Sequence, residues 1–198
     1  MIHLIGVDHF RAQRKKRGLE LTEIQRQYQS VVESAIQSLH PDLLAEEDHP
    51  DYLAEDDAES ILCTVARSHD IKHAFIEASR AMQMSLGYKD LNMIHDLLAA
   101  RGTPSDILAN AHKFSHQFPI REKFWLQQIN KTGADNILLI CGDLHLQSFT
   151  TILIAVGIPY SIIAEKIGVD LANNLEYESL RYALDHNMFG DTNCFCLR

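Results

Sequence analysis

Short apolar runs alternate with longer amphipathic stretches along most of the chain. Residues 2–7 form a continuous apolar run, as expected for a buried strand. In residues 22–39 the apolar positions recur at intervals of three and four, which is typical of an amphipathic helix. Thr22 is a suitable N-cap for this helix, and Pro41 prevents it from extending much beyond Leu39.

The same alternation continues downstream. Strands are predicted at 42–48, 71–79, 136–145 and 159–165, and helices at 56–70, with Asp56 or Asp57 as the cap, and at 146–158. Residues 80–130 have a helical composition interrupted near Gly102 and Pro104, so two or three helices are expected there. The pattern predicts an α/β fold with a mostly parallel central sheet, helices on both of its faces and a helical insertion at about 80–130.

Length and composition favour one domain spanning residues 1–198. The chain is 46% hydrophobic and 23% charged, which is ordinary for a globular protein. No run approaches the roughly 18 apolar residues of a transmembrane helix, and the first residues predict a strand rather than a secretion signal. Four cysteines in a chain of this length are too few for a disulfide framework. These features predict a cytoplasmic protein without membrane contact.

The overall charge limits the expected partners. A net charge of −9 makes nucleic acid and anionic membranes unfavourable partners. Residues 11–17 depart from this balance, because they carry five cations. Such a segment is either a solvated loop or a grip for a phosphate or an acidic substrate. The oligomeric state stays open, with a twofold homodimer as the commonest assembly.

Two predicted strands end in the same pattern, Gly-x-x-His. Gly6 and His9 follow the first strand, and Gly142 and His145 follow the strand at 136–145. We expect each glycine to let the backbone turn. Ligands of an open parallel sheet bind beyond the carboxyl ends of its strands, so both histidines are expected to project over that edge.

Carboxylates end the other strands. The second strand ends at Glu46 and Glu47 and the third near Glu77, while Asp143 lies inside the second Gly-x-x-His motif. Adjacent strand residues point to opposite faces, so only one of Glu46 and Glu47 faces the site. Two imidazoles with two to four carboxylates are suitable ligands for a divalent transition metal, with an oxygen left for a general base.

Four segments in this order carry a resemblance to a known family. The segments "IHLIGVDHF", "PDLLAEED", "REKFWLQQI" and "ILLICGDLHLQSFTTIL" resemble those of the TraB, PrgY and GumN group, which includes the Tiki proteases. More distant relatives are the ChaN-like and erythromycin esterase proteins. The resemblance spans residues 2–163 and implies their α/β fold. Within this resemblance, the spacing of the family's Pro-Asp…Glu motif matches Glu47 rather than Glu46. The start of the third segment matches the family's arginine with Arg121.

The resemblance implies a metal-dependent hydrolase. Its substrate would be a small molecule or peptide with an amide, ester or related bond. His9, Glu47 and His145 would hold manganese, cobalt, zinc or iron. Glu77 or Asp143 would then act as the general base, and Arg121 would stabilise an oxyanion or hold a substrate carboxylate.

Two other functions remain open at this point. In a metal-free hydrolase, as described for the erythromycin esterase relatives, His9 or His145 would be the base and Glu47 would orient it. In a regulatory or carrier protein, the histidines would bind haem, a metal or another small ligand without catalysis, as the ChaN-like relatives bind haem. Sensitivity to a chelator separates the two hydrolases, and a co-purifying chromophore would indicate the carrier.

Overall fold

The computed structural model describes residues 1–55, 57–87 and 117–169, and a five-stranded parallel sheet lies at its centre. The strand order is β5-β3-β6-β1-β7. The bounds are Lys72–Phe75 (β5), Leu43–Glu46 (β3), Ile137–Gly142 (β6), Ile2–Val7 (β1) and Tyr160–Ile167 (β7). Each neighbouring pair runs parallel. The predicted α/β fold with a parallel central sheet is therefore confirmed.

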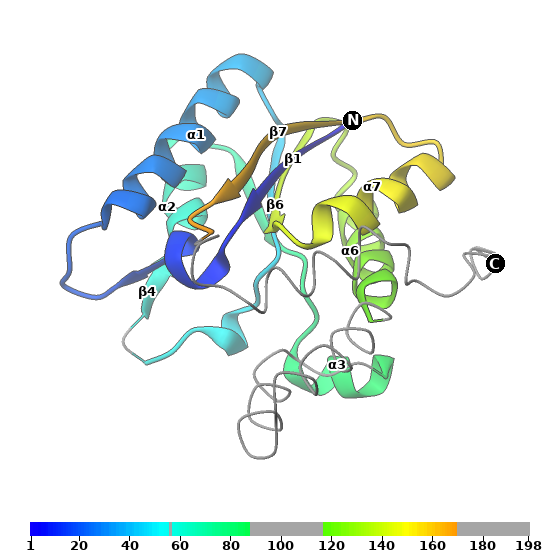
Figure 1. Cartoon of the computed structure of the whole chain (residues 1–198), viewed down its shortest axis with the longest axis horizontal. Coiled ribbons are helices and arrows are strands. Elements are labelled where there is room, and N and C mark those ends of the chain that lie inside the picture. The colour runs from blue at the N-terminus through cyan, green and yellow to red at the C-terminus, as the bar shows by residue number, and fades with distance from the viewer. Residues whose placement is uncertain (56, 88–116, 170–198) are drawn as a thin grey trace.

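Helices cover both faces of this sheet. Helices α1 (Glu23–Leu39) and α2 (Ile61–Ser68) lie on one face, and α6 (Phe118–Thr132) and α7 (His145–Ala155) lie on the other (Figure 1). A short helix, α3 (Arg80–Leu86), follows β5. Of the predicted helical insertion, α3 and α6 are described, whereas residues 88–116 and the tail 170–198 lie outside the described part of the chain.

The central strand explains why its sequence is apolar throughout. In β6, Ile140 belongs to the core cluster on the α1 and α2 face, together with Tyr28. Its neighbour Leu139 belongs to the opposite cluster, together with Trp125. Side chains that alternate between two covered faces must all be apolar, so the run carries no polar positions. None of the described helices is long and apolar enough to cross a membrane.

The first amphipathic helix begins and ends as predicted. Thr22 caps α1 through a capping box, because its hydroxyl accepts from the Gln25 backbone and the Gln25 side chain accepts from the Thr22 backbone. The chain then leaves the helix at His40, which adopts the left-handed conformation, immediately before Pro41. These contacts are local in sequence, which is why the sequence sufficed to predict them.

The helix predicted at 56–70 is wrong at its start. Residues Asp57–Ser60 form a strand, β4, and α2 begins only at Ile61. The N-cap is Ser60, whose hydroxyl accepts from the Cys63 backbone at 3.0 Å. Asp57 instead accepts from the Ala54 backbone at 2.8 Å. Strand β4 exists because it has an antiparallel partner, β2, elsewhere in the chain.

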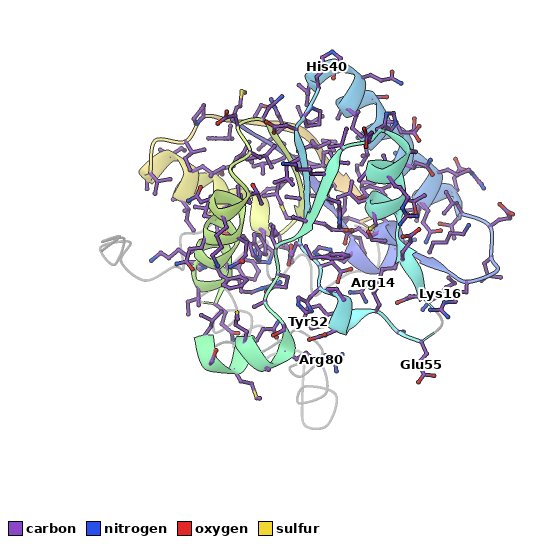
Figure 2. All side chains as sticks on the ribbon, turned by 180° about the vertical axis from the view of Figure 1, so that it is seen from behind. Arg14, Lys16, His40, Tyr52, Glu55 and Arg80 are labelled. Atoms are coloured by element: carbon purple, nitrogen blue, oxygen red, sulfur yellow. The ribbon has the colours of Figure 1, made fainter. Side chains whose placement is uncertain are left out.

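That partner comes from the basic segment. Strand β2 (Arg14–Lys16) pairs with β4, so part of the segment predicted as a loop is a strand. Arg14, labelled in Figure 2 together with Lys16, contacts both carboxylate oxygens of Asp48, at 2.8 and 3.1 Å. Lys16 Nζ lies 2.7 Å from Asp57 Oδ1. These two cations are therefore held by acids of the same chain rather than left for a phosphate.

The loops at the two ends of the sheet separate in space. Figure 2 shows His40, which precedes β3, at the opposite end of the molecule from Tyr52 and Arg80. Tyr52 closes the 3-10 turn η2 (Pro50–Tyr52) after β3, and Arg80 begins α3 after β5. The end near Tyr52 and Arg80 is thus the carboxyl edge of the sheet, where the predicted site residues follow their strands.

Replacing Gly6 with alanine is expected to destabilise the fold. A Cβ at this position would lie 2.6 Å from Asp143 Oδ1 and 2.6 Å from Leu146 Cδ1. Overpacking of this kind lowers the free energy of unfolding by about 1–3 kcal/mol. Urea unfolding measures this change. The control is Ser34→Ala at an exposed position of α1, whose free energy of unfolding should stay within about 0.5 kcal/mol of wild type. Equal midpoints for the two variants would contradict the packing.

Candidate functional site

Three adjacent strands bring the predicted metal ligands to one place. His9 follows β1 at the start of a π-helical turn, η1 (His9–Gln13), and His145 is the first residue of α7 after β6. Glu47 follows β3, and its backbone N–H donates to Ile140 of β6 at 2.9 Å. Since β3, β6 and β1 are neighbours, their carboxyl ends converge. The two Gly-x-x-His motifs therefore meet.

The meeting point is the carboxylate of Glu47. Its Oε2 lies 3.0 Å from His9 Nε2, and its Oε1 lies 3.4 Å from His145 Nε2. Glu47 is buried, and the Gly142 backbone N–H donates to Oε2 at 2.7 Å. Glu46 points away from this cluster, accepting from the Ser60 hydroxyl at 2.7 Å. As predicted, only one of the adjacent glutamates faces the histidines.

The motif glycines are needed for close approach rather than for a turn. Neither Gly6 nor Gly142 is among the glycines with positive φ, so the expectation that they let the backbone turn is wrong. A Cβ at Gly142 would lie 2.8 Å from His9 Nε2 and 3.4 Å from Glu47 Oε2. Only glycine leaves room for the imidazole of one motif against the backbone of the other.

Each histidine is held at its other ring nitrogen. His9 Nδ1 bonds Gln13 Oε1, four residues further along η1. His145 Nδ1 lies 2.7 Å from Glu122 Oε1, which also accepts from the Ser148 hydroxyl. Gln13 and Glu122 are both fully buried. An oxygen acceptor at Nδ1 places a proton there and directs Nε2 toward Glu47.

Arg121 links the remaining predicted residues to the cluster. From near the start of α6, its Nη1 lies 3.1 Å from His145 Nε2, and its Nη2 donates to Glu47 Oε1 at 2.5 Å. Its Nε also donates to Glu77 Oε2 at 3.0 Å, and Trp125 Nε1 donates to the same oxygen at 3.1 Å. Glu77 reaches this position because Ile76, before it, still pairs with β3 after β5 ends.

Asp143 bonds the backbone of two other strands of the sheet. Its Oδ1 accepts from the Lys166 backbone at 2.6 Å, and its own backbone donates to Val7 at 3.0 Å. These bonds join the end of β6 to β7 and β1. They fix the position of Asp143 in the second motif, and its role as an alternative general base stays a prediction.

Burial and the neighbouring charged groups shift the pKa values of several residues in the cluster. Burial alone raises the pKa of Glu47, but its electrostatic interactions with His145, His9 and Arg121 outweigh burial and hold that pKa well below its usual range. Burial alone lowers the pKa of His9, but Glu47 outweighs it and raises the pKa to about 9. Burial raises the pKa of Glu122, with its hydrogen bond to His145 opposing the rise. Glu47 is thus an anion and His9 a cation at neutral pH.

The raised pKa of His9 predicts a pH-dependent stability in chelator-treated protein. The folded pKa of about 9 exceeds the ordinary value of 6.5, so the stabilisation is complete below pH 6.5 and is lost as the pH rises through 9. The expected loss is roughly 2–3 kcal/mol. Urea unfolding at pH 6.5 and at pH 9 measures this loss as a difference in the free energy of unfolding. In His9→Gln, the part of the difference that comes from His9 should be absent. An unchanged pH dependence in His9→Gln would refute the assignment.

The residues fit a divalent metal in the kind of their donors, two imidazole nitrogens and a carboxylate. His9 Nε2 is buried and, despite its closeness to Glu47, has no aligned hydrogen-bond partner. The Glu47 oxygens lie 3.0 and 3.4 Å from the two Nε2 atoms. These separations are similar to the distance of about 3.4 Å between donor atoms around a tetrahedral zinc.

One cation already competes for this space. Within the described ranges, no three His, Cys, Asp or Glu side chains are arranged to hold an ion as they stand. The guanidinium of Arg121 bridges His145 and Glu47, so it must shift before both face one ion.

Sequence reasoning missed the residues that orient the histidines. These are Gln13, Glu122 and Ser148. Gln13 carried a signal, since a residue four positions after His9 lies one helical turn away. Glu122 follows Arg121 directly and carried none, because its contact with His145 depends on how α6 packs on α7.

No protein-family model, curated protein or solved structure matches this chain, so the resemblance to the TraB group remains a proposal that rests on the residues themselves.

Proposed function

We propose that this protein is a metal-dependent hydrolase of the TraB and Tiki kind, with His9, Glu47 and His145 as the ligands of one divalent transition metal. The observation that carries the proposal is the convergence of two Nε2 atoms on one buried carboxylate. The oxygen acceptor at each Nδ1 adds to it, because metal-bound histidines almost always donate their other ring N–H in this way.

Each remaining residue of the cluster has an assigned task. When bound, manganese, cobalt, zinc or iron would supply Lewis acid chemistry at a scissile carbonyl. Arg121, held by Glu77, supplies N–H donors for the negative charge that develops on the carbonyl oxygen. Glu77, the second carboxylate on that guanidinium, accepts the proton of the attacking water.

The proposed substrate is a small molecule or peptide with an amide, ester or related bond. The cytoplasm is the proposed location, and a homodimer the proposed assembly. The acidic net charge supports small or peptide substrates over nucleic acid.

A hydrolysis screen tests the proposed function. Purified protein is stripped with a chelator, reloaded separately with manganese, cobalt, zinc or iron, and assayed on nitrophenyl esters and peptide nitroanilides. Cleavage that disappears on chelation and returns with one metal is the expected result. Cleavage that persists after complete metal removal would overturn the metal-dependent mechanism.

One contact favours a second candidate, a metal-free hydrolase. Glu122 Oε1 lies 2.7 Å from His145 Nδ1, the contact by which a carboxylate orients a histidine base. In that mechanism His145 is the base, oriented by Glu122 rather than by Glu47, and Arg121 again stabilises the oxyanion. Its activity would be insensitive to chelators and abolished by His145→Ala.

A further inference from the structure

The basic segment 11–17, whose cations the proposed reaction does not use, holds the chain beside Glu47. Arg14 donates from Nε and Nη2 to the two carboxylate oxygens of Asp48, at 3.1 and 2.8 Å. Its third donor nitrogen, Nη1, donates to the Tyr52 carbonyl oxygen at 2.8 Å (Arg14 and Tyr52 are labelled in Figure 2). A planar guanidinium that makes three such bonds fixes its partners more tightly than an ammonium group could.

Asp48 directly follows the proposed metal ligand. The Asp48 backbone N–H donates to the Glu46 carbonyl at 2.8 Å, which closes a three-residue turn with Glu47 at its centre. Asp48 is only 2% exposed, and a carboxylate buried to this extent must be paired. Arg14 supplies that pair, so the contact that neutralises Asp48 also fixes one end of the turn that carries Glu47.

Tyr52 connects Arg14 to the other carboxylate of the site. The Tyr52 hydroxyl donates to the Ala78 carbonyl at 2.5 Å and accepts from the Gln83 side-chain amide. Ala78 directly follows Glu77, and its backbone N–H donates to Glu77 Oε1 at 2.7 Å. A continuous set of contacts therefore leads from Arg14 through Tyr52 to Glu77.

Arg14 is itself held in place by two neighbouring elements. It begins β2, where it pairs with Ser60 of β4, and its carbonyl oxygen accepts from Gln25 Nε2 at 2.7 Å. Gln25 belongs to the capping box of α1. The guanidinium therefore extends from a fixed backbone, and the loops that follow β3 and β5 are held against it.

We propose that Arg14 is a positioning residue for both carboxylates of the candidate site, Glu47 through Asp48 and Glu77 through Tyr52. Its purpose rests on the proposed function, in which Glu47 is a metal ligand and Glu77 is the general base. Among the contacts of the described residues, Arg14 bonds neither of these carboxylates, so it takes no part in the chemistry. The basic segment then acts on the site through the fold rather than by binding an acidic substrate.

One backbone N–H and one side-chain N–H report the positions of the two carboxylates in the metal-free full chain. The Gly142 amide donates to Glu47 Oε2 at 2.7 Å. The indole of Trp125, the one tryptophan of the chain, donates to Glu77 Oε2 at 3.1 Å. Nitrogen-edited NMR follows the proton exchange of both groups. Arg14→Gln should accelerate both exchange rates about tenfold, because each N–H loses a fixed and charged acceptor.

Two further variants divide this effect, which a general loss of stability would not do. Asp48→Asn should accelerate exchange at Gly142 and leave Trp125 unchanged, because the bond from the guanidinium to Tyr52 remains. Tyr52→Phe should do the reverse, because it removes the hydroxyl that leads to Glu77's strand end. Unchanged exchange at both groups in Arg14→Gln, or equal acceleration at both groups in all three variants, would overturn the proposal.

Lys16→Gln is the matched control. It removes another cation of the same strand, one that lies 2.7 Å from Asp57 Oδ1. Both exchange rates should stay within about twofold of wild type in this variant. Arg14→Lys keeps the charge but not the planar fork, so it should fold and show intermediate exchange. Wild-type exchange in Arg14→Lys would contradict a role for the fork, and this variant decides the question if Arg14→Gln does not fold.

Zinc affinity is the second readout, measured by competition with a chelating dye. It should fall about 10–100-fold in Arg14→Gln and Asp48→Asn, as for other residues that orient metal ligands. It should be unchanged in Lys16→Gln and Tyr52→Phe, since Glu77 is not a ligand. Wild-type zinc affinity in Arg14→Gln would contradict the positioning of Glu47. If wild type binds no zinc, manganese, cobalt or iron, the proposed function fails, while the exchange rates still decide the role of Arg14.

Discussion

Glu47→Gln is expected to abolish metal binding and hydrolysis together. Glutamine keeps the shape of the side chain but removes the charge on which His9, His145 and Arg121 converge. Loss of a partner of a metal ligand lowers affinity about 10–100-fold, so loss of the ligand itself should exceed 100-fold. Metal affinity and kcat/KM measure the effect.

The adjacent glutamate supplies the control for this variant. Glu46→Gln makes the same chemical change one residue earlier, at a side chain that bonds Ser60 and His73 on the other face of the sheet. It should alter stability but retain both metal binding and hydrolysis. Removing one partner from a buried ion pair costs about 3–5 kcal/mol, so the folding of both variants must be checked. Full activity in Glu47→Gln would disprove its role.

Arg121→Gln is expected to separate catalysis from metal binding. The change removes the guanidinium that bridges His145 and Glu47, so a metal no longer competes with it and its affinity should rise. Loss of an oxyanion donor lowers kcat by about 100- to 1000-fold. Steady-state kinetics and dye competition on the same preparation measure the two effects.

A conservative variant of Arg121 is the control for misfolding in this experiment. Arg121→Lys keeps one positive charge between Glu47 and Glu77 but not the fork that contacts both. It should fold, bind metal and show intermediate activity. A parallel fall of metal affinity and kcat in both variants would show instead that Arg121 is needed to build the ligand set.

The elements predicted correctly are those whose cause is local. The apolar runs of β1 and β6, and the spacing and cap of α1, lie within single segments of sequence. The pair of β2 and β4 was missed because Asp57 looks like a helix cap until its partner Lys16 is known. Short strands that pair with distant segments leave no periodicity of their own.

The candidate site also contains residues that could be predicted from the sequence and residues that could not. Residues that closely follow strands, His9, Glu47 and His145, were predictable because parallel strands bring their carboxyl ends to one edge of the sheet. The partners at Nδ1, Gln13 and Glu122, depend on a rare π-helical turn and on the packing of α6 against α7. The role of Gly142 was also hidden, because close approach of a distant His9 leaves no mark in the sequence around it.

Metal content tests the central claim most directly. Wild type, His9→Ala and His145→Ala are incubated with manganese, cobalt, zinc and iron, desalted and analysed by elemental mass spectrometry. His69→Ala, an exposed histidine after α2, is the control. The account predicts about one transition metal per chain in wild type and His69→Ala, and a loss in both site variants. No bound metal in wild type, or equal metal in all four proteins, would contradict a metal held where the two motifs meet.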